Sequence, residues 1–181
     1  MRLGGPIFSD SHDPEELARL HRAEGYRAAY CPGWLTAADA EAVRAVTQAF
    51  HRADLVIAEV GAWGHILHPD PTVAERNRAR VVERLQLAEA VGARCCVDYT
   101  GSYGEDWFHP KNLSAEAFDA IVEITRGIVD AVRPTRTVFA LEMMPSVHPE
   151  SPDEYLRLLA AVDRPGQVGV HLDPVNLINS P

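Results

Sequence analysis

The chain has 181 residues, of which 46% are hydrophobic, and a formal net charge of −9. Its length and composition are those of one globular domain, which we expect to span residues 1–181. The acidic balance argues against nucleic acid and membrane surfaces as partners, because phosphate binding depends on clustered lysine and arginine, and Lys111 is the only lysine.

Two further features indicate the compartment. No apolar run reaches the ~20 residues that span a bilayer, and no basic segment followed by an apolar one opens the sequence. The three cysteines, Cys31, Cys95 and Cys96, form no C-x-x-C pair and are expected to be reduced. These features predict a cytoplasmic protein.

Six apolar stretches of strand length alternate with helices along the chain. In order, the expected strands are residues 2–8, 26–32, 55–60, 95–99, 138–145 and 168–173. Five helices lie between them, each preceded by an N-cap residue whose side chain can accept a hydrogen bond from the first turn. The expected N-caps are Asp13, Thr36, Asp70, Ser114 and Ser151.

Strands and helices that alternate in units of ~30 residues predict an α/β protein with a parallel sheet and right-handed crossovers. An open doubly wound sheet would normally carry a G-x-G-x-x-G turn after its first strand, and Gly4-Gly5-Pro6 does not match it. We therefore expect the (β/α)8 TIM-barrel type of fold. Such a barrel has eight strands, so the chain is expected to hold about six β/α units and to lack the last two.

The most informative stretch is the fifth expected strand, in which Glu142 interrupts an apolar run. A buried, unpaired carboxylate costs several kcal/mol or takes up a proton, so such a residue normally has a metal, a cation or a hydrogen-bond network around it. In the sixth strand, alternation places Gly169, His171 and Asp173 on one face. Glu142 and Asp173 would then project from the C-terminal ends of neighbouring parallel strands, where α/β barrels place their chemistry.

These two strands resemble a known family. The stretches Leu141–Pro145 (LEMMP) and His171–Asn176 (HLDPVN) are similar to strands five and six of the sugar phosphate isomerase/epimerase family, whose members are xylose isomerase-like TIM barrels. The resemblance implies a divalent metal held by a glutamate, an aspartate, a histidine and a second glutamate on strands five to eight. Glu142 and Asp173 match the first two, and the other two would lie beyond Pro181. Several epimerases of the family carry histidine at the position of Asn176, which leaves the substrate open.

The chemistry that the resemblance implies is proton transfer at a carbon next to a carbonyl, through an enediolate stabilised by a divalent cation. In this interpretation Glu142 is a metal ligand and the catalytic acid/base, and Asp173 is a metal ligand only. Oxygen ligands favour Mn²⁺ or Mg²⁺, and a histidine in the set would also admit Zn²⁺ or Co²⁺. The implied substrate is a small carbohydrate: a sugar, a sugar phosphate or a polyol ketone. His171 is expected to form an interior hydrogen bond rather than to bind the metal.

Further residues at strand ends and in loops are candidates for substrate binding. They are Trp63, His65, Asp98, Trp107, His148 and Asn176. Aromatic faces pack against the C–H faces of sugars, but these rings equally fit a role in capping the barrel rim. His65 and His68 form an H-x-x-H pair that suits either zinc or a polar loop, and the acidic net charge favours the loop. Glu142 and Asp173 have an alternative role too, because acids at strand ends often bind loop amides or arginines.

Three functional hypotheses fit the sequence. The first is a metal-dependent isomerase or epimerase, and the second is a lyase or dehydratase that uses the same enolate chemistry on the same barrel. The third is a non-catalytic truncated fragment. For residues 1–181 alone we expect weak or absent metal binding, because two carboxylates supply too few ligands for a catalytic divalent ion. The open edges of a six-stranded sheet also predict association, for example as a homo-oligomer.

Overall fold

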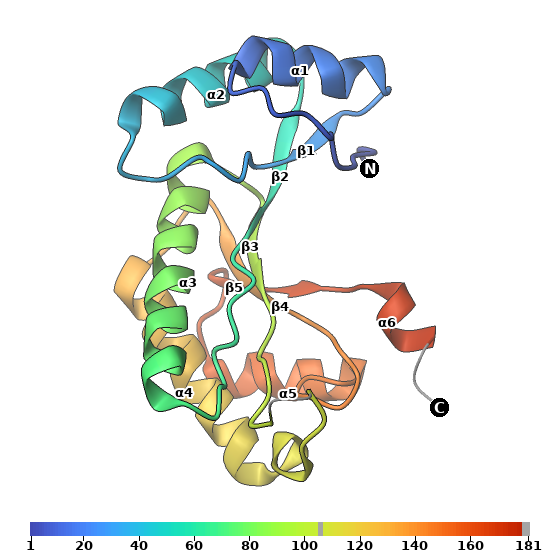
Figure 1. Cartoon of the computed structure of the whole chain (residues 1–181). Coiled ribbons are helices and arrows are strands. Elements are labelled where there is room, and N and C mark those ends of the chain that lie inside the picture. Colours follow the sequence, from blue (N-terminus) through green and yellow to red (C-terminus); the bar gives the residue numbers. More distant parts are fainter. Residues whose placement is uncertain (105–106, 179–181) are drawn as a thin grey trace.

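The computed structural model describes residues 1–104 and 107–178. Its centre is one parallel sheet in the order β1-β2-β3-β4-β5, in which each strand pairs with the next along the chain. The strands are β1 (Ala28–Tyr30), β2 (Val56–Gly61), β3 (Cys95–Asp98), β4 (Val138–Glu142) and β5 (Val168–His171). With its helices, this sheet forms a TIM-barrel-like α/β fold, which confirms the predicted fold class (Figure 1).

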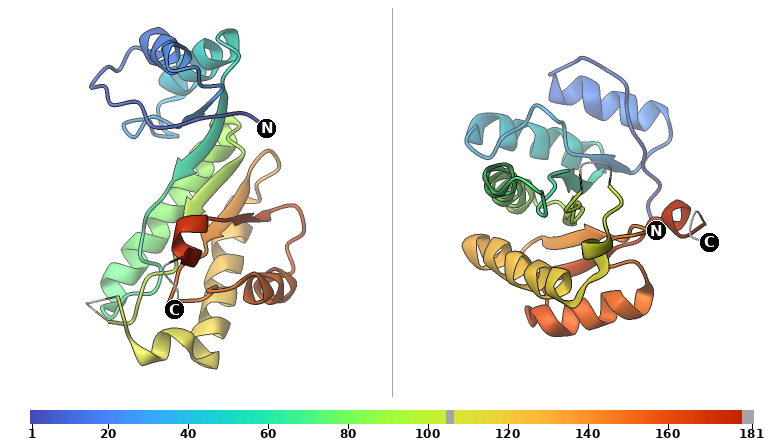
Figure 2. Two further views of the ribbon diagram at one scale, coloured as in Figure 1. Left: turned by 90° about the vertical axis from the view of Figure 1, so that its right-hand side faces the viewer. Right: turned by 60° about the horizontal axis from the view of Figure 1, so that its bottom comes forward.

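Helix α1 precedes β1, and the long helices after it connect successive strands. The long helices are α1 (Pro14–Ala23), α2 (Ala40–Arg52), α3 (Pro71–Val91), α4 (Ala115–Val132) and α5 (Pro152–Val162). The right-hand view of Figure 2 shows them as an arc around the sheet, as expected for the outer layer of a barrel. Two shorter elements are the 3₁₀-helix η1 (Pro110–Leu113), before α4, and α6 (Pro174–Ile178), after β5.

Most helix starts follow the signals in the sequence. The side chains of Asp13, Asp70, Ser114 and Ser151 each accept a hydrogen bond from the first turn of their helix. The expectation for Thr36 was wrong: α2 begins after Asp39, whose carboxylate accepts from the Ala42 N–H at 2.9 Å. A turn separates Thr36 from the helix, because the Asp39 N–H donates to the Thr36 carbonyl at 3.3 Å.

The segment at residues 2–8 is not a strand of the sheet. Gly4 forms an isolated bridge to Ala28, and the Leu3 carbonyl accepts hydrogen bonds from the Arg27 and Ala28 N–H groups at 2.8 and 3.0 Å. Pro6 has no N–H to donate, which limits any longer pairing. The sheet in the described residues therefore has five strands, and the prediction of six was wrong.

The hydrophobic core lies between the helices and the sheet. Among its largest fully buried side chains are Phe50 from α2, Leu85 from α3, Ile121 from α4 and Phe139 from β4. These residues fix α2, α3 and α4 against the strands, so the strand ends are held by a rigid support.

Two composition-based expectations can be compared with the structure. Cys31, Cys95 and Cys96 carry free thiols, as predicted, and Cys31 and Cys96 are buried. Within residues 1–104 and 107–178, no helix is both long enough and apolar enough to span a bilayer.

Candidate functional site

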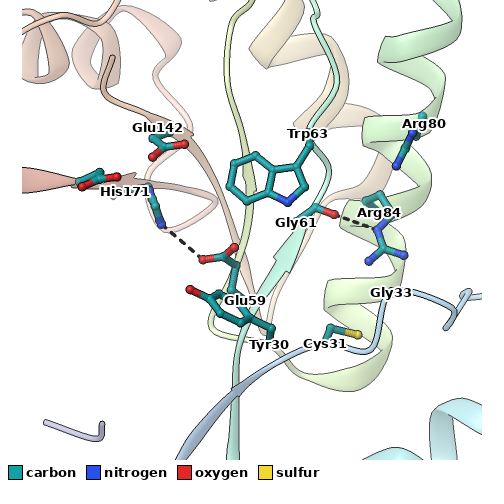
Figure 3. Close-up of a pocket in the computed structure, with 11 residues that line it drawn as sticks. Tyr30, Cys31, Gly33, Glu59, Gly61, Trp63, Arg80, Arg84, Glu142 and His171 are labelled. Atoms are coloured by element: carbon teal, nitrogen blue, oxygen red, sulfur yellow. Dashed lines mark hydrogen bonds and ion pairs between the residues drawn. The ribbon is translucent and has the colours of Figure 1, made fainter. Parts of the chain in front are cut away.

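A cavity of about 450 Å³ opens at the C-terminal ends of the strands. Figure 3 shows the side chains around it. The lining residues are Tyr30, Cys31, Gly33, Glu59, Gly61, Trp63, Arg80, Arg84, Glu142, His171 and Asp173. Because β1, β2, β4 and β5 end at Tyr30, Gly61, Glu142 and His171, the cavity occupies the position at which parallel barrels carry out chemistry.

Small residues leave room for this cavity. Gly61, Val97, Ala140 and Gly169 pair in register across β2 to β5 and form one level of the sheet. A Cβ atom added at Gly169 would lie 2.7 Å from Val138 Cγ2, so a larger residue there would displace its neighbour. The small residues of this level therefore leave space in which longer side chains from the levels on either side, such as Glu59 and His171, can approach each other.

Glu142 and Asp173 both line the cavity: Glu142 ends β4, and Asp173 follows the end of β5 rather than lying in the strand. The Asn176 side-chain amide donates to Glu142 Oε1 at 3.2 Å and to the Met143 carbonyl at 3.2 Å. The Val175 N–H donates to Asp173 Oδ1 at 2.8 Å. The first turn of α6 therefore orients both carboxyl groups.

The electrostatic environment of Glu142 is acidic. Burial raises the pKa of the Glu142 carboxyl above its ordinary value, and the charge of His171 acts in the opposite direction. The negative charge and a hydrogen bond of Asp173 raise that pKa further. Two carboxylates in contact repel each other unless a proton or a cation lies between them, so the pair fits a divalent cation.

The described residues do not complete a metal site. In residues 1–104 and 107–178, no group of three or more His, Cys, Asp or Glu side chains is placed to hold a metal ion. Metal binding by Glu142 and Asp173 therefore stays a prediction.

His171 pairs with a residue that we did not single out from the sequence. His171 Nε2 lies 3.3 Å from Glu59 Oε2, and this hydrogen bond raises the pKa of His171 against the effect of burial. His171 is thus hydrogen-bonded inside the fold, as expected. A signal for Glu59 existed: it interrupts the apolar β2 in the way that Glu142 interrupts β4.

Trp63 is the substrate-binding candidate that lines the cavity. Its backbone is left-handed, with φ of 49°, and its ring stacks on Tyr99 with centroids 6.0 Å apart. A Cβ atom at Gly61 would clash with Trp63 Nε1, so glycine at the end of β2 lets the indole lie against the strand. With 43% of its surface exposed, Trp63 can present a face to a ligand.

His65 and Trp107 belong to an aromatic cluster beside the cavity, outside its lining. The His65 ring meets Tyr99 and Trp107 edge-on, with centroids 4.9 and 5.7 Å apart. His68 lies next to His65, with ring centroids 6.4 Å apart. Burial lowers the pKa of His65, and the charge of His68 lowers it further.

The structure does not bring Asp98 to the cavity lining. Asp98 is fully buried, and its Oδ1 accepts from the Gly64 N–H at 2.6 Å. Burial raises the pKa of the Asp98 carboxyl well above its ordinary value. This contact holds the loop that carries Trp63, so Asp98 acts on the site through that loop.

His148 also lies away from the lining. Its Nδ1 is 3.0 Å from Glu154 Oε2 and its Nε2 is 3.2 Å from the Ser114 carbonyl, so both ring nitrogens are occupied. The ring is buried and meets Phe118 edge-on. Asn176, by contrast, reaches the site indirectly, through its hydrogen bond to Glu142.

A family model described as a xylose isomerase-like TIM barrel matches residues 17–180. No protein of curated function matches the sequence. Solved structures match at low sequence identity, which shows a shared fold. A putative xylose isomerase from Rhodospirillum rubrum aligns with a TM-score of 0.67 and 19% identity, over 88% of this chain and 60% of its own.

Two further structures are similar. A xylose isomerase-like TIM barrel protein from Mycobacterium smegmatis, in complex with magnesium, has a TM-score of 0.65 and 19% identity, over 92% of this chain and 58% of its own. A D-psicose 3-epimerase from Clostridium cellulolyticum H10 has a TM-score of 0.65 and 16% identity, over 96% of this chain and 62% of its own. Other matches include another sugar epimerase and a probable dehydratase. The chain spans about 60% of the length of the solved structures it matches.

Proposed function

Because the chain belongs to the xylose isomerase-like TIM barrel family, we propose that its cavity is the catalytic site of a divalent-metal-dependent isomerase or epimerase. The proposed substrate is a sugar, a sugar phosphate or a polyol ketone, and the reaction is proton transfer through an enediolate. The observation that carries this proposal is the convergence of Glu142 and Asp173 in one cavity at the strand ends. The sugar epimerases among the similar structures support it.

Each acid has a separate proposed role. A divalent cation such as Mn²⁺ or Mg²⁺, held by Glu142 and Asp173, would supply stabilisation of the negative charge that develops on the substrate oxygens. Glu142 moves the proton. Its Oε1 accepts from Asn176, which leaves Oε2 as the atom that takes the proton from carbon and returns it.

Other cavity residues bind and orient the substrate. The exposed indole of Trp63 is proposed to pack against the C–H face of the sugar. His171, held by Glu59 and in register with Glu142, is proposed to keep the cavity polar beside Glu142. Because Asn176 joins α6 to the Glu142 carboxylate, it is a positioning residue for the proton transfer.

The test is Glu142→Gln, since the amide keeps the shape of the side chain but cannot carry the proton. Candidate ketoses are incubated in D₂O with Mn²⁺ or Mg²⁺, and deuterium incorporation next to the carbonyl is followed by NMR in the 181-residue protein and in any longer form. We expect exchange in an active form to fall at least ~1,000-fold in the variant, as general acid–base catalysis contributes ~10²–10⁴-fold and a charge contact is lost as well.

The matched control is Glu83→Gln, which removes an exposed carboxylate from α3 outside the cavity lining. It should exchange at the unmodified rate. If Glu142→Gln retained most of the exchange, or if no form exchanged any ketose, the proposed function would be wrong.

A further inference from the structure

One wall of the cavity is positively charged. Arg80 and Arg84 lie one helical turn apart on α3, and both line the cavity that holds Glu142. Figure 3 shows Glu142 and His171 on one side of Trp63 and the two arginines on the other. The acidic end accounts for the proposed proton transfer, whereas the basic end has no role in it.

Arg84 is held in place by neutral partners. Its Nε donates to the Gly61 carbonyl at 3.1 Å, and its Nη1 donates to the Leu35 carbonyl at 3.0 Å. These bonds fix the guanidinium at the end of β2 but do not neutralise its charge. They also leave Nη2 available, because no described partner binds it.

Arg80 has no structural contact that explains its position. It is exposed, and no hydrogen bond or ion pair involves it among residues 1–104 and 107–178. The charge of Arg80 acts on the buried Asp98 and lowers its pKa, but no hydrogen bond or ion pair joins the two side chains among the described residues, and Asp98 Oδ1 accepts from the Gly64 N–H.

Several arginines elsewhere in the chain are held by a carboxylate. Arg2, Arg27, Arg52, Arg126 and Arg164 each pair with a carboxylate. Arg80 and Arg84 differ from these five because both line the cavity and neither pairs with a carboxylate in the part of the chain that the structure describes, so both can face an anionic ligand.

We infer that the substrate carries an anionic group, a phosphate or a carboxylate, which Arg80 and Arg84 bind while its carbonyl end lies at Glu142. The position of the carbonyl end rests on the proposed function; the contact of the arginines with an anion does not. Guanidinium groups bind phosphate and carboxylate through paired hydrogen bonds, so either anion satisfies this wall. The cavity volume of about 450 Å³ falls within the ~300–1,000 Å³ of small-molecule sites.

Calorimetric titration of the 181-residue protein at low ionic strength tests the inference. The probes are D-ribulose, D-ribulose 5-phosphate, 2-keto-D-gluconate and inorganic phosphate. We expect at least one anionic sugar to bind about tenfold or more tightly than D-ribulose, since hydrogen bonds to charged groups have that strength. The anion that gains affinity identifies the group as phosphate or carboxylate.

Substitutions then assign the gain to the arginines. Arg80→Gln should lose about tenfold in affinity for the favoured anion and leave D-ribulose unchanged. Arg84→Lys keeps a charge but loses the Nη2 donor and the two bonds to the Gly61 and Leu35 carbonyls that fix it, so it should weaken binding of the same anion. Arg44→Gln, an exposed site on α2 with the same change in charge, is the control and should bind as the unmodified protein does.

Two results would overturn the inference: no preference for any anion in the unmodified protein, or a preference that survives both Arg80→Gln and Arg84→Lys. Circular dichroism confirms that each variant is folded. The titration measures affinity rather than turnover. A failure of the anion-binding inference can therefore be told apart from a failure of the proposed function. An anion preference that depends on the arginines would stand even if Glu142→Gln left deuterium exchange intact.

Discussion

Replacing Asp98 by asparagine separates a structural role from a substrate contact. Asp98 is fully buried, its Oδ1 accepts from the Gly64 N–H at 2.6 Å, and its Oδ2 has no partner in the described residues. Asparagine keeps the oxygen that accepts this hydrogen bond and cannot ionise. We therefore expect Asp98→Asn to fold and to keep the loop around Gly64 in place.

The size of the effect depends on pH. Burial raises the pKa of Asp98 in the folded state, so above the ordinary aspartate pKa of ~3.9 the unfolded chain releases a proton that the folded chain keeps. The contribution of Asp98 to stability is then complete below that value and is lost as pH rises toward the folded-state pKa. The loss amounts to about 1.4 kcal/mol for each pH unit over which the folded state retains the proton. Asp98→Asn lacks this loss and should become the more stable protein as pH rises.

Urea denaturation followed by tryptophan fluorescence, between pH 4 and pH 8, measures the difference in unfolding free energy. Taking the difference between the two proteins cancels the titration of all other acids. A difference that stays constant over this range would show that burial does not perturb Asp98. A loss of ligand affinity in Asp98→Asn without any change in stability would show that Asp98 contacts substrate.

Two further substitutions test the elements around the cavity. Tyr155→Phe should lower the unfolding free energy by about 1–2 kcal/mol, because the single O–H of the buried Tyr155 is shared between the Leu141 and Gly169 carbonyls and joins β4 to β5. An unchanged urea midpoint would contradict this. Glu142→Gln should shift the melting temperature by less than ~3 °C, equivalent to roughly 1 kcal/mol in a chain of this size. A larger fall in a calorimetric scan would mean that Glu142 stabilises the fold itself.

The parts of the fold that local chemistry determines could be predicted from the sequence. An N-cap acts within one turn, so Asp13 or Ser151 reveals a helix start without reference to the rest of the molecule. The meeting of Glu142 with Asp173 was predictable because side chains alternate along a strand and parallel strands end at the same edge. The prediction of Thr36 as N-cap was wrong because Thr36 and Asp39 can both accept a hydrogen bond from the first turn of a helix. The sequence alone does not show that the chain turns before Asp39 and begins α2 there.

The rest of the cavity depends on contacts that no local pattern contains. Glu59 reaches His171 across a level of small residues, and that approach follows from the curvature of the sheet. Arg84 points over the end of β2 from a neighbouring helix, where an arginine is normally solvated. Trp63 and Trp107 adopt positive φ angles of 49° and 69°, which are uncommon for residues other than glycine, so propensity could not orient their rings.

The strand edges and the metal ligands together give a last prediction for the 181-residue chain. Within the described residues, β5 pairs only with β4 and is followed by Leu172, whose surface is 58% exposed, whereas the outer edge of β1 is partly bridged by Gly4. Open strand edges with exposed apolar side chains promote pairing between molecules, and an edge lysine opposes it. Light scattering should therefore show association that Leu172→Lys reduces.

Calorimetric titration of the same samples with Mn²⁺ should show weak binding, because Glu142 and Asp173 supply two ligands and a divalent ion in proteins usually takes about six. Glu142→Gln should weaken Mn²⁺ binding further, because it removes one of the two carboxylate ligands. Tight, stoichiometric binding of Mn²⁺ by a monomer would contradict both parts of this prediction. The remaining ligands would then have to come from within residues 1–181, and His65, His68 and His148 would be the first to replace. Because both nitrogens of His148 are already hydrogen-bonded, a role for it would also require that it leave Glu154 and Ser114.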